Sequence, residues 1–168
     1  MSARPSTRAA PSPRAVREAA AWQAVAAVED PEIPVLTLAD LGILRFVKVR
    51  SDGVLEVGLS PTYTGCPAAE AIRHVAERAL LEAGLGPVEV ISVLSPAWSS
   101  AWITPEGRHK LAEYGIAPPP ATPADHPVAC PSCQSLNTER ISQFGSTPCK
   151  ALHRCRSCLE PFECFKCI

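Results

Sequence analysis

The sequence has few aromatic residues, almost no net charge and, over most of its length, almost no cysteine. Only 5% of its 168 residues are aromatic, and 16 basic side chains balance 17 acidic ones, which leaves a net charge of −1. Such a balance argues against a surface adapted to nucleic acid or to an acidic membrane. No apolar run is long enough to span a bilayer, and no hydrophobic signal segment stands at the N-terminus. With 46% hydrophobic residues, the composition predicts a packed globular protein of the reducing cytoplasm.

Seven of the eight cysteines lie beyond residue 129, and four of these form two C-x-x-C pairs separated by 21 residues. The paired residues are Cys130, Cys133, Cys155 and Cys158. Four thiolates suit a tetrahedral Zn²⁺ ion, and a segment of about 40 residues rarely folds on an apolar core alone. We therefore predict a zinc ribbon of three short strands, with these cysteines as ligands. A disulfide network and a cysteine-ligated iron–sulfur cluster are alternatives that fit the spacing less well.

Three further thiols lie in the same segment: Cys149, and the third C-x-x-C pair formed by Cys164 and Cys167. If a strand runs through Cys164 and Cys167, their side chains point to opposite faces, which makes them poor candidates for one shared metal ion. Cys149 stands near the second C-x-x-C pair. All three remain candidates for extra metal-binding thiols.

The remaining cysteine, Cys66, lies where a strand pattern gives way to a helix pattern. Residues 54–59 alternate apolar and polar side chains, and residues 68–83 repeat apolar side chains at helical spacing. Pro67 suits the first position of a helix, which would place Cys66 at the N-cap. Free N–H groups and the helix dipole would there favour a thiolate, as a nucleophile or as a ligand for a soft metal. A buried cysteine that acts only as a small apolar residue is the alternative.

The remaining patterns predict an α+β fold. The Ser51-Asp52-Gly53 turn should join strands 43–50 and 54–59 as an antiparallel hairpin. The helix after residue 67 should then lead to a strand at 88–94 that runs parallel to one of the first two. With helices over 15–28 and 104–114, the order is α-β-β-α-β-α around a mixed three-stranded sheet, followed by the zinc ribbon of short β-strands.

Prolines mark the expected domain boundary, because five of them lie between residues 117 and 127 and predict a semi-extended linker. Residues 1–14 carry three arginines among Pro, Ser and Ala without an apolar run, which predicts a disordered tail. The expected organisation is therefore this tail, a domain over residues 15–116, the linker, and the ribbon over residues 128–168.

Three motifs resemble the small domain of iron–sulfur assembly factors related to SufT. They are D-P-E-I-P at residues 30–34, D-L-G at 40–42 and P-T-Y-T-G-C-P at 61–67, and the resemblance covers about residues 22–116. It implies an iron or iron–sulfur contact at Cys66, with Asp30 and Glu32 as nearby carboxylates that bind the metal or contact a partner.

The cysteine-rich tail resembles a narrower family, that of the D subunits of bacterial phenylacetyl-CoA epoxidase, PaaD. The resemblance rests on S-T-P-C-K-A-L at residues 146–152 and on the E-P-F and F-K-C motifs that begin at residues 160 and 165. The chain departs from the usual pattern at Ala101, where an Asp is common, and at Cys164, where an aromatic residue is common. Members of this family accompany a diiron oxygenase and its iron–sulfur, flavin-containing reductase without belonging to the core catalytic complex.

The resemblance implies an accessory protein of aerobic phenylacetate degradation rather than an enzyme. It would help to assemble or deliver an iron or iron–sulfur centre to the oxygenase and reductase subunits of the epoxidase. The expected cofactor is zinc, with iron or an iron–sulfur cluster as transient cargo. No nucleic-acid or membrane partner is expected, and the chain could form a homodimer.

Two other functions fit parts of the pattern. Cys66 could be the nucleophile of a thiol-dependent enzyme, but the histidines offer no convincing base, since His74 lies two turns along the same helix and His109 lies on another. The zinc ribbon could bind nucleic acid or protein. Residues 128–168 carry five basic and three acidic side chains, however, and a net charge of +2 is a weak nucleic-acid footprint.

Overall fold

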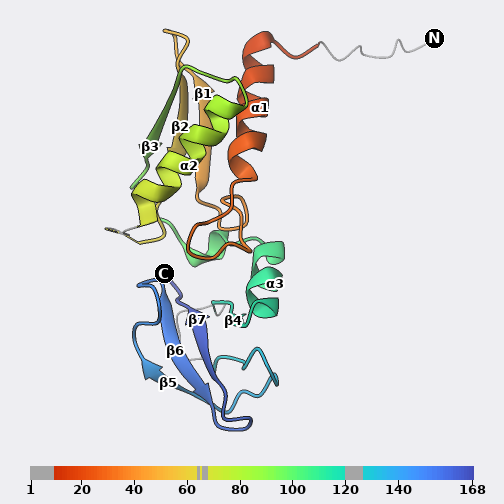
Figure 1. Cartoon of the computed structure of the whole chain (residues 1–168), viewed down its shortest axis with the longest axis vertical. Coiled ribbons are helices and arrows are strands. Elements are labelled where there is room, and N and C mark those ends of the chain that lie inside the picture. Colours follow the sequence, from red (N-terminus) through yellow and green to blue (C-terminus); the bar gives the residue numbers. More distant parts are fainter. Residues whose placement is uncertain (1–9, 64, 66–67, 120–126) are drawn as a thin grey trace, which may run out of the picture.

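The computed structural model describes residues 10–63, 65, 68–119 and 127–168. Within these residues the chain forms helices and two sheets, drawn in Figure 1. The elements are α1 (Pro13–Ala26), β1 (Leu44–Val49), β2 (Leu55–Leu59), α2 (Ala68–Glu82), β3 (Val88–Ser92), the 3₁₀ helix η1 (Ser100–Trp102), α3 (Pro105–Glu113), β4 (Ile116–Ala117), β5 (Thr138–Ser142), β6 (Lys150–Cys155) and β7 (Pro161–Phe165).

The first sheet has the strand order β1-β2-β3. β1 and β2 are antiparallel, with Leu44 opposite Leu59 and Val49 opposite Leu55, while β2 and β3 are parallel. Gly53 in the connecting turn has φ 85°, a left-handed conformation that glycine adopts at no steric cost. The hairpin, the mixed sheet and the α+β class predicted from the sequence are confirmed.

α1 and α2 lie side by side on one face of this sheet, with α1 against β1 and α2 against β3 (Figure 1). α2 turns Ile72, Ala76 and Leu80 inward at intervals of four residues, so these side chains form one buried stripe. α1 begins at Pro13, where the Ser12 side chain accepts a hydrogen bond from the helix. This start is two residues earlier than predicted, because the cap lies inside the stretch assigned to a disordered tail. Residues 1–9 of that tail lie outside the described part of the chain.

The second sheet has the strand order β4-β7-β6-β5. β6 runs antiparallel to both β5 and β7, which gives the three ribbon strands that the sequence predicted. The fourth strand is different, because β4 joins the sheet parallel to β7, with Ile116 opposite Glu163 and Ala117 opposite Cys164. Ala117 was expected to open the linker. A two-residue strand carries no periodic pattern, so the sequence could not reveal it.

The ribbon packs against the rest of the chain through side chains as well as through β4. The larger of two hydrophobic cores, the first core, lies beneath the first sheet and includes side chains from that sheet, α1 and α2. Phe165 and Cys149 are buried in this first core rather than in the core of the ribbon. The Phe165 ring lies 5.9 Å from the Trp98 ring, centroid to centroid, and the indole N–H of Trp98 donates to the Leu41 carbonyl at 2.9 Å. The Ser100 backbone N–H donates to the Ile168 carbonyl at 3.0 Å. The end of the ribbon is therefore fixed to the loop that follows β3.

The turn before β1 is held by Asp40, which is buried. Its carboxylate accepts hydrogen bonds from the Thr37 backbone N–H at 3.0 Å and from Lys110 Nζ at 2.8 Å, while its own N–H donates to the Thr37 hydroxyl at 3.1 Å. The reciprocal Thr37–Asp40 pair is a capping box. Lys110 belongs to α3, so the same carboxylate ties α3 to this turn.

Candidate metal sites

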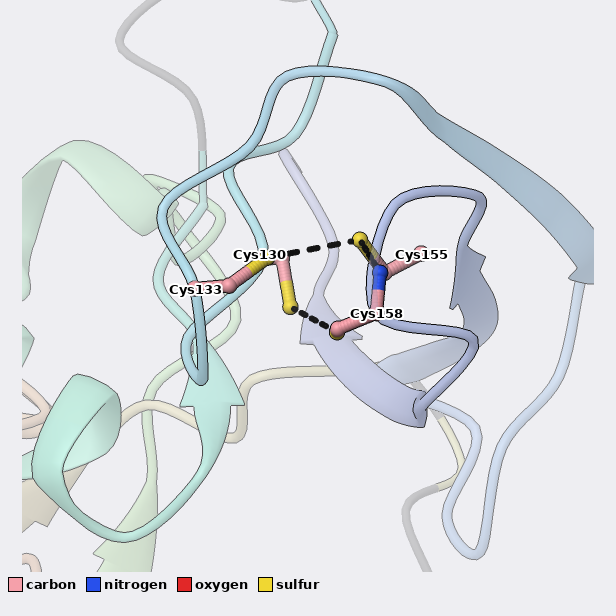
Figure 2. Close-up of side chains that lie close together, drawn as sticks. All are labelled: Cys130, Cys133, Cys155 and Cys158. Atoms are coloured by element: carbon pink, nitrogen blue, oxygen red, sulfur yellow. Dashed lines mark hydrogen bonds between the residues drawn. The ribbon is translucent and has the colours of Figure 1, made fainter.

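The four cysteines of the two C-x-x-C pairs converge at one end of the ribbon. Cys130 and Cys133 come from the loop before β5, Cys155 is the last residue of β6, and Cys158 lies in the turn between β6 and β7. Figure 2 shows the four side chains pointing toward one another. All four sulfur atoms lie within 4.8 Å of one another. The Sγ atoms of Cys130 and Cys158 are 3.7 Å apart, and those of Cys133 and Cys155 are 3.6 Å apart.

These separations fit a zinc ion. Four sulfurs placed tetrahedrally at about 2.3 Å from Zn²⁺ are separated from each other by about 3.8 Å. The backbone N–H groups of Ser157 and Cys158 each lie 3.4 Å from Cys155 Sγ. The Cys158 N–H, helped by the Ser157 N–H and opposed by burial, lowers the pKa of the Cys155 thiol to about 6. A thiolate, the form that binds metal, is thus favoured at this position.

The residue after each of the two C-x-x-C pairs that converge at this site has the same unusual backbone conformation. Gln134 has φ 61° and Leu159 has φ 67°, and they are the only non-glycine residues with positive φ in the described part of the chain. A left-handed residue reverses the chain directly after the second cysteine of each pair. The two loops thus use the same type of turn to bring their sulfurs together. Glycine would adopt this left-handed conformation at a lower energetic cost than Gln134 or Leu159.

The three remaining ribbon thiols occupy three different environments. Cys164 is buried in the small ribbon core with Phe162, and burial raises the pKa of its thiol to about 11. Cys167 is half-buried, with its sulfur 3.7 Å from the Ser100 hydroxyl. Cys149 is buried in the large core. None of them belongs to the four-cysteine group, so the structure gives no reason to count them as zinc ligands.

The loop after α1 carries the two carboxylates singled out in the sequence. Asp30 is 6% exposed, and its Oδ1 accepts hydrogen bonds from the backbone N–H groups of Glu32 at 2.9 Å and Ile33 at 2.8 Å. Burial, and then the like charge of Asp30, raise the pKa of the Glu32 carboxyl, while the charge of Lys150 acts in the opposite direction. Negative charge is therefore poorly solvated in this loop, and a cation beside it would be stabilised.

These carboxylates share a small cavity with the ribbon. The cavity has a volume of about 20 Å³ and is lined by Asp30, Glu32, Ile33, Leu41, Thr62, Ala68, Ile72, Cys149 and Phe165. Thr62 and Ala68 are described residues on either side of the segment that contains Cys66. Cys66 itself lies outside the described residues, so its contact with Asp30 and Glu32 stays a prediction. The candidate bases His74 and His109 do not line this cavity.

The sequence did not indicate that Cys149 and Lys150 approach the Asp30 loop. Both follow a turn in the ribbon, and no local pattern shows which core a buried side chain will join. The one available signal was that Cys149 stands outside the C-x-x-C pairs, in a polar turn where a buried thiol has no obvious structural use.

Comparison with known proteins agrees with this division of features along the chain. Residues 117–166 match the family described as the PaaD zinc beta ribbon domain, and residues 18–93 match the family described as iron–sulfur cluster assembly protein. The ribbon match begins at the residue where β4 ends. No helix in the described residues combines the length and the hydropathy that crossing a membrane requires.

Individual relatives fall into the same two groups. A protein of Escherichia coli K12, named as the putative D subunit of 1,2-phenylacetyl-CoA epoxidase, is 48% identical over 151 residues, which cover 88% of this chain and 91% of that protein. An Fe-S protein maturation auxiliary factor of Porphyromonas gingivalis is 33% identical over 85 residues, which cover 50% of this chain and 80% of that protein.

Among solved structures, the fold resembles a domain of unknown function, DUF59, from Bacillus anthracis. The TM-score is 0.52 at 23% identity, over 57% of this chain and 92% of that one, which supports the fold alone. The ribbon match and the near full-length similarity to the Escherichia coli protein carry the assignment. The chain belongs to the PaaD family, in which an iron–sulfur assembly domain is joined to a zinc ribbon.

Proposed function

We propose that this protein is an accessory maturation factor of phenylacetyl-CoA epoxidation. In this role it binds iron or an iron–sulfur cluster as cargo and helps to install it in the oxygenase or the iron–sulfur reductase of the epoxidase, in the cytoplasm. It is not itself a catalyst. Support comes from the names of the two relatives, one a putative epoxidase subunit and the other an Fe-S protein maturation factor.

The structural observation that carries the proposal is the cavity that Asp30 and Glu32 line beside the segment containing Cys66. Carboxylate oxygens are hard ligands and thiolate sulfur is a soft one, and iron accepts both. The Asp30 side chain is held in place by two backbone N–H groups, both on Oδ1, so they do not engage Oδ2. A cation at the loop would offset the like charges of Asp30 and Glu32.

The two metals have different roles in this proposal. Zinc stays in the ribbon as a structural ion, held by Cys130, Cys133, Cys155 and Cys158, and contributes folding free energy. Iron is the cargo, and Cys66 holds it only until a client protein offers its own ligands. An open set of few ligands suits this transfer, because cargo that is fully enclosed by its carrier leaves slowly.

The test separates maturation from catalysis. Cells that lack this protein should grow poorly on phenylacetate and should contain a reductase with low cluster occupancy. Purified oxygenase and reductase whose centres are already loaded should turn over at the same rate with and without the added protein. A many-fold rate increase on adding it to fully loaded components would refute the accessory role.

The Cys66→Ser variant tests the residue that should hold the cargo. It should fold and retain its zinc, because serine is close in size to cysteine and can cap a helix. It should fail to restore growth, because a neutral hydroxyl is a poor iron ligand in a sulfur-rich site. Full complementation by zinc-loaded Cys66→Ser protein would show that Cys66 does not hold the cargo and acts only as a small buried side chain.

A further inference from the structure

Cys149 belongs to the ribbon by sequence, but its side chain packs in the core of the other part of the chain. It directly precedes β6, the strand that ends at the zinc ligand Cys155, yet it is 7% exposed and packs in the core beneath the first sheet. The small ribbon core contains Cys130, Cys155 and Cys164 but not Cys149. Its position therefore depends on how the ribbon docks on the other part of the chain.

At this position Cys149 lines the cavity of Asp30 and Glu32. Among the residues that line it, these three carry the side chains that commonly bind metal, and the other walls are apolar apart from Thr62. The two carboxylates come from the loop after α1 and the thiol comes from the ribbon. Neither part of the chain provides the whole set.

Hydrogen bonds fix the turn that carries Cys149. The Thr147 hydroxyl lies 3.0 Å from Cys149 Sγ, close enough to donate a hydrogen bond to the sulfur. Lys166 is bonded to the same turn through its backbone N–H, which donates to the Cys149 carbonyl at 2.9 Å. Its ammonium group is close enough for its charge to interact with that of the Cys149 sulfur. The Lys166 ammonium also donates to the Pro148 carbonyl at 2.7 Å, so the turn holds the Cys149 sulfur at the wall of the cavity.

We infer that Cys149 is a sulfur ligand for the iron cargo at Asp30 and Glu32, so that the ribbon completes the cargo site as well as packing over it. The inference rests on the proposed function and deepens it by naming a ligand from the second part of the chain. Binding replaces the thiol proton by iron, so one proton is released for each thiol that coordinates.

The cavity limits the form of the cargo. Its volume of about 20 Å³ accommodates about one water-sized particle. The cavity thus has room for a single iron ion. This iron is either a free ion or one corner of a cluster whose other atoms lie outside the cavity. Among the described residues, only the four zinc-site cysteines already stand close enough together to hold an ion. The ligand atoms of Asp30, Glu32 and Cys149 are thus farther apart than those of the four-cysteine site, and binding iron requires them to approach one another.

The first experiment uses ferrous iron as the probe, added without oxygen to the zinc-loaded full chain. The wild type should bind iron with a thiolate-to-iron charge-transfer absorption. Cys149→Ser should reduce that absorption and weaken binding by at least about tenfold, the lower end of what losing even an outer partner of a metal ligand costs. Glu32→Gln should weaken binding similarly while retaining the sulfur absorption.

The matched control is Cys167→Ser, which changes a ribbon thiol outside the cavity and should leave iron affinity and absorption unchanged. All variants should retain their zinc, and fluorescence from the Trp98 region should show that the ribbon is still docked. Cys149→Ala removes the sulfur without placing a hydroxyl in an apolar core and should reproduce the effect of Cys149→Ser.

A second arm repeats the comparison with a cluster assembled on the chain from iron and sulfide. If binding of ferrous iron requires Cys149, the cargo is a free ion. If only binding of the assembled cluster requires Cys149, the cargo is a cluster that places one corner in the cavity. If docked, zinc-loaded Cys149→Ser and Cys149→Ala bind both probes as the wild type does, the inference is wrong. Maturation in cells is a separate readout, since the proposed function can fail there while the Cys149 site stands.

Discussion

The two cores of this chain are stabilised by different means. The core beneath the first sheet buries mainly Leu, Ile and Val side chains, whereas the ribbon core has five buried residues, of which three are cysteines. Each large apolar side chain that is fully buried contributes about 1.5–3 kcal/mol, which is sufficient for the first core and far too little for the second. We therefore expect the ribbon to depend on metal binding, whereas the first core depends on packing.

The boundary between the two cores does not follow the boundary between the two parts of the chain. Phe165 and Cys149 belong to the ribbon by sequence but to the first core by packing, while Ala117 precedes the prolines but packs in the ribbon core. Each part thus completes the other. Perturbing one core should therefore have a defined and limited effect on the other.

Zinc removal should have the largest effect. A chelator should extract about one Zn²⁺ per chain and unfold the ribbon, because structural zinc contributes about 10–16 kcal/mol of folding free energy in small modules. NMR spectra should then lose the dispersed signals of β5, β6 and β7, while those of β1, β2 and β3 persist.

Single substitutions identify the zinc ligands. Cys155→Ser should abolish zinc binding, and Cys164→Ser and Cys149→Ser should retain it. The opposite pattern would refute the assigned ligand set.

Replacing Phe165 should break the link between the cores. Phe165→Ala removes a ring that is 1% exposed and packs on Trp98, and such a change costs about 3–5 kcal/mol. We expect the ribbon to undock while its zinc stays bound, seen as a changed Trp fluorescence at constant zinc content. Phe144→Ala is the matched control, because this ring is 54% exposed. Zinc loss from the Phe165 variant would mean that docking and metal binding are one process.

Acid should weaken the first core through Asp40. Burial raises the pKa of this carboxyl, but hydrogen bonds from Lys110 and Thr37 outweigh it and hold the pKa below its ordinary value of 3.8. A depressed pKa in the folded state stabilises the fold above pH 3.8, and that contribution is lost as the pH falls through the folded value.

Asp40→Asn should therefore cost about 1.5–3 kcal/mol at neutral pH, as expected for a hydrogen bond to a charged group, and should flatten the acid branch of the stability curve. Glu89→Gln removes an exposed carboxylate that pairs with Arg50 and should cost less than about 1 kcal/mol. Urea unfolding at several pH values measures both, and an unchanged acid branch in Asp40→Asn would contradict this account.

The smallest expected effect is a gain of stability in the ribbon. Leu159 has φ 67° and is 72% exposed, so Leu159→Gly relieves backbone strain and removes little buried surface. Relief of about 1–2 kcal/mol, less the entropy cost of glycine of about 0.5–1 kcal/mol, leaves a gain of up to about 1.5 kcal/mol. Zinc retention against a competing chelator should rise. Leu136→Gly, at an exposed position without positive φ, should show no gain.

Local patterns predicted most of the fold. Alternation over residues 54–59, the Ser51–Gly53 turn and the helical spacing after residue 67 predicted the hairpin and the sequence of elements, because each of these signals is complete within a few residues. Which strand of the hairpin pairs with β3 was left open, and the structure places β3 beside β2. The convergence of Cys130, Cys133, Cys155 and Cys158 was predictable for the same reason, since C-x-x-C is a local spacing; their role as zinc ligands stays a prediction.

Features that depend on long-range contacts were not predictable. The pairing of Ala117 with Cys164 and the burial of Phe165 against Trp98 join residues far apart in the chain, and neither leaves a periodic trace. The same holds for the cavity that Cys149 and Asp30 line together, because it forms only when the ribbon is docked on the first core.

The position of β4 also constrains the order of events during protein synthesis. Residues 116–117 leave the ribosome well before residues 161–165, which form the strand that pairs with them in the described part of the chain. Domains generally begin to fold from the N-terminal side while synthesis continues. The first sheet and its helices can thus form early, but Trp98 then lacks the Phe165 ring, and the Asp30 loop is not yet covered by Cys149. We therefore expect the carboxylate loop of the nascent chain to stay uncovered by the ribbon until β7 has been translated.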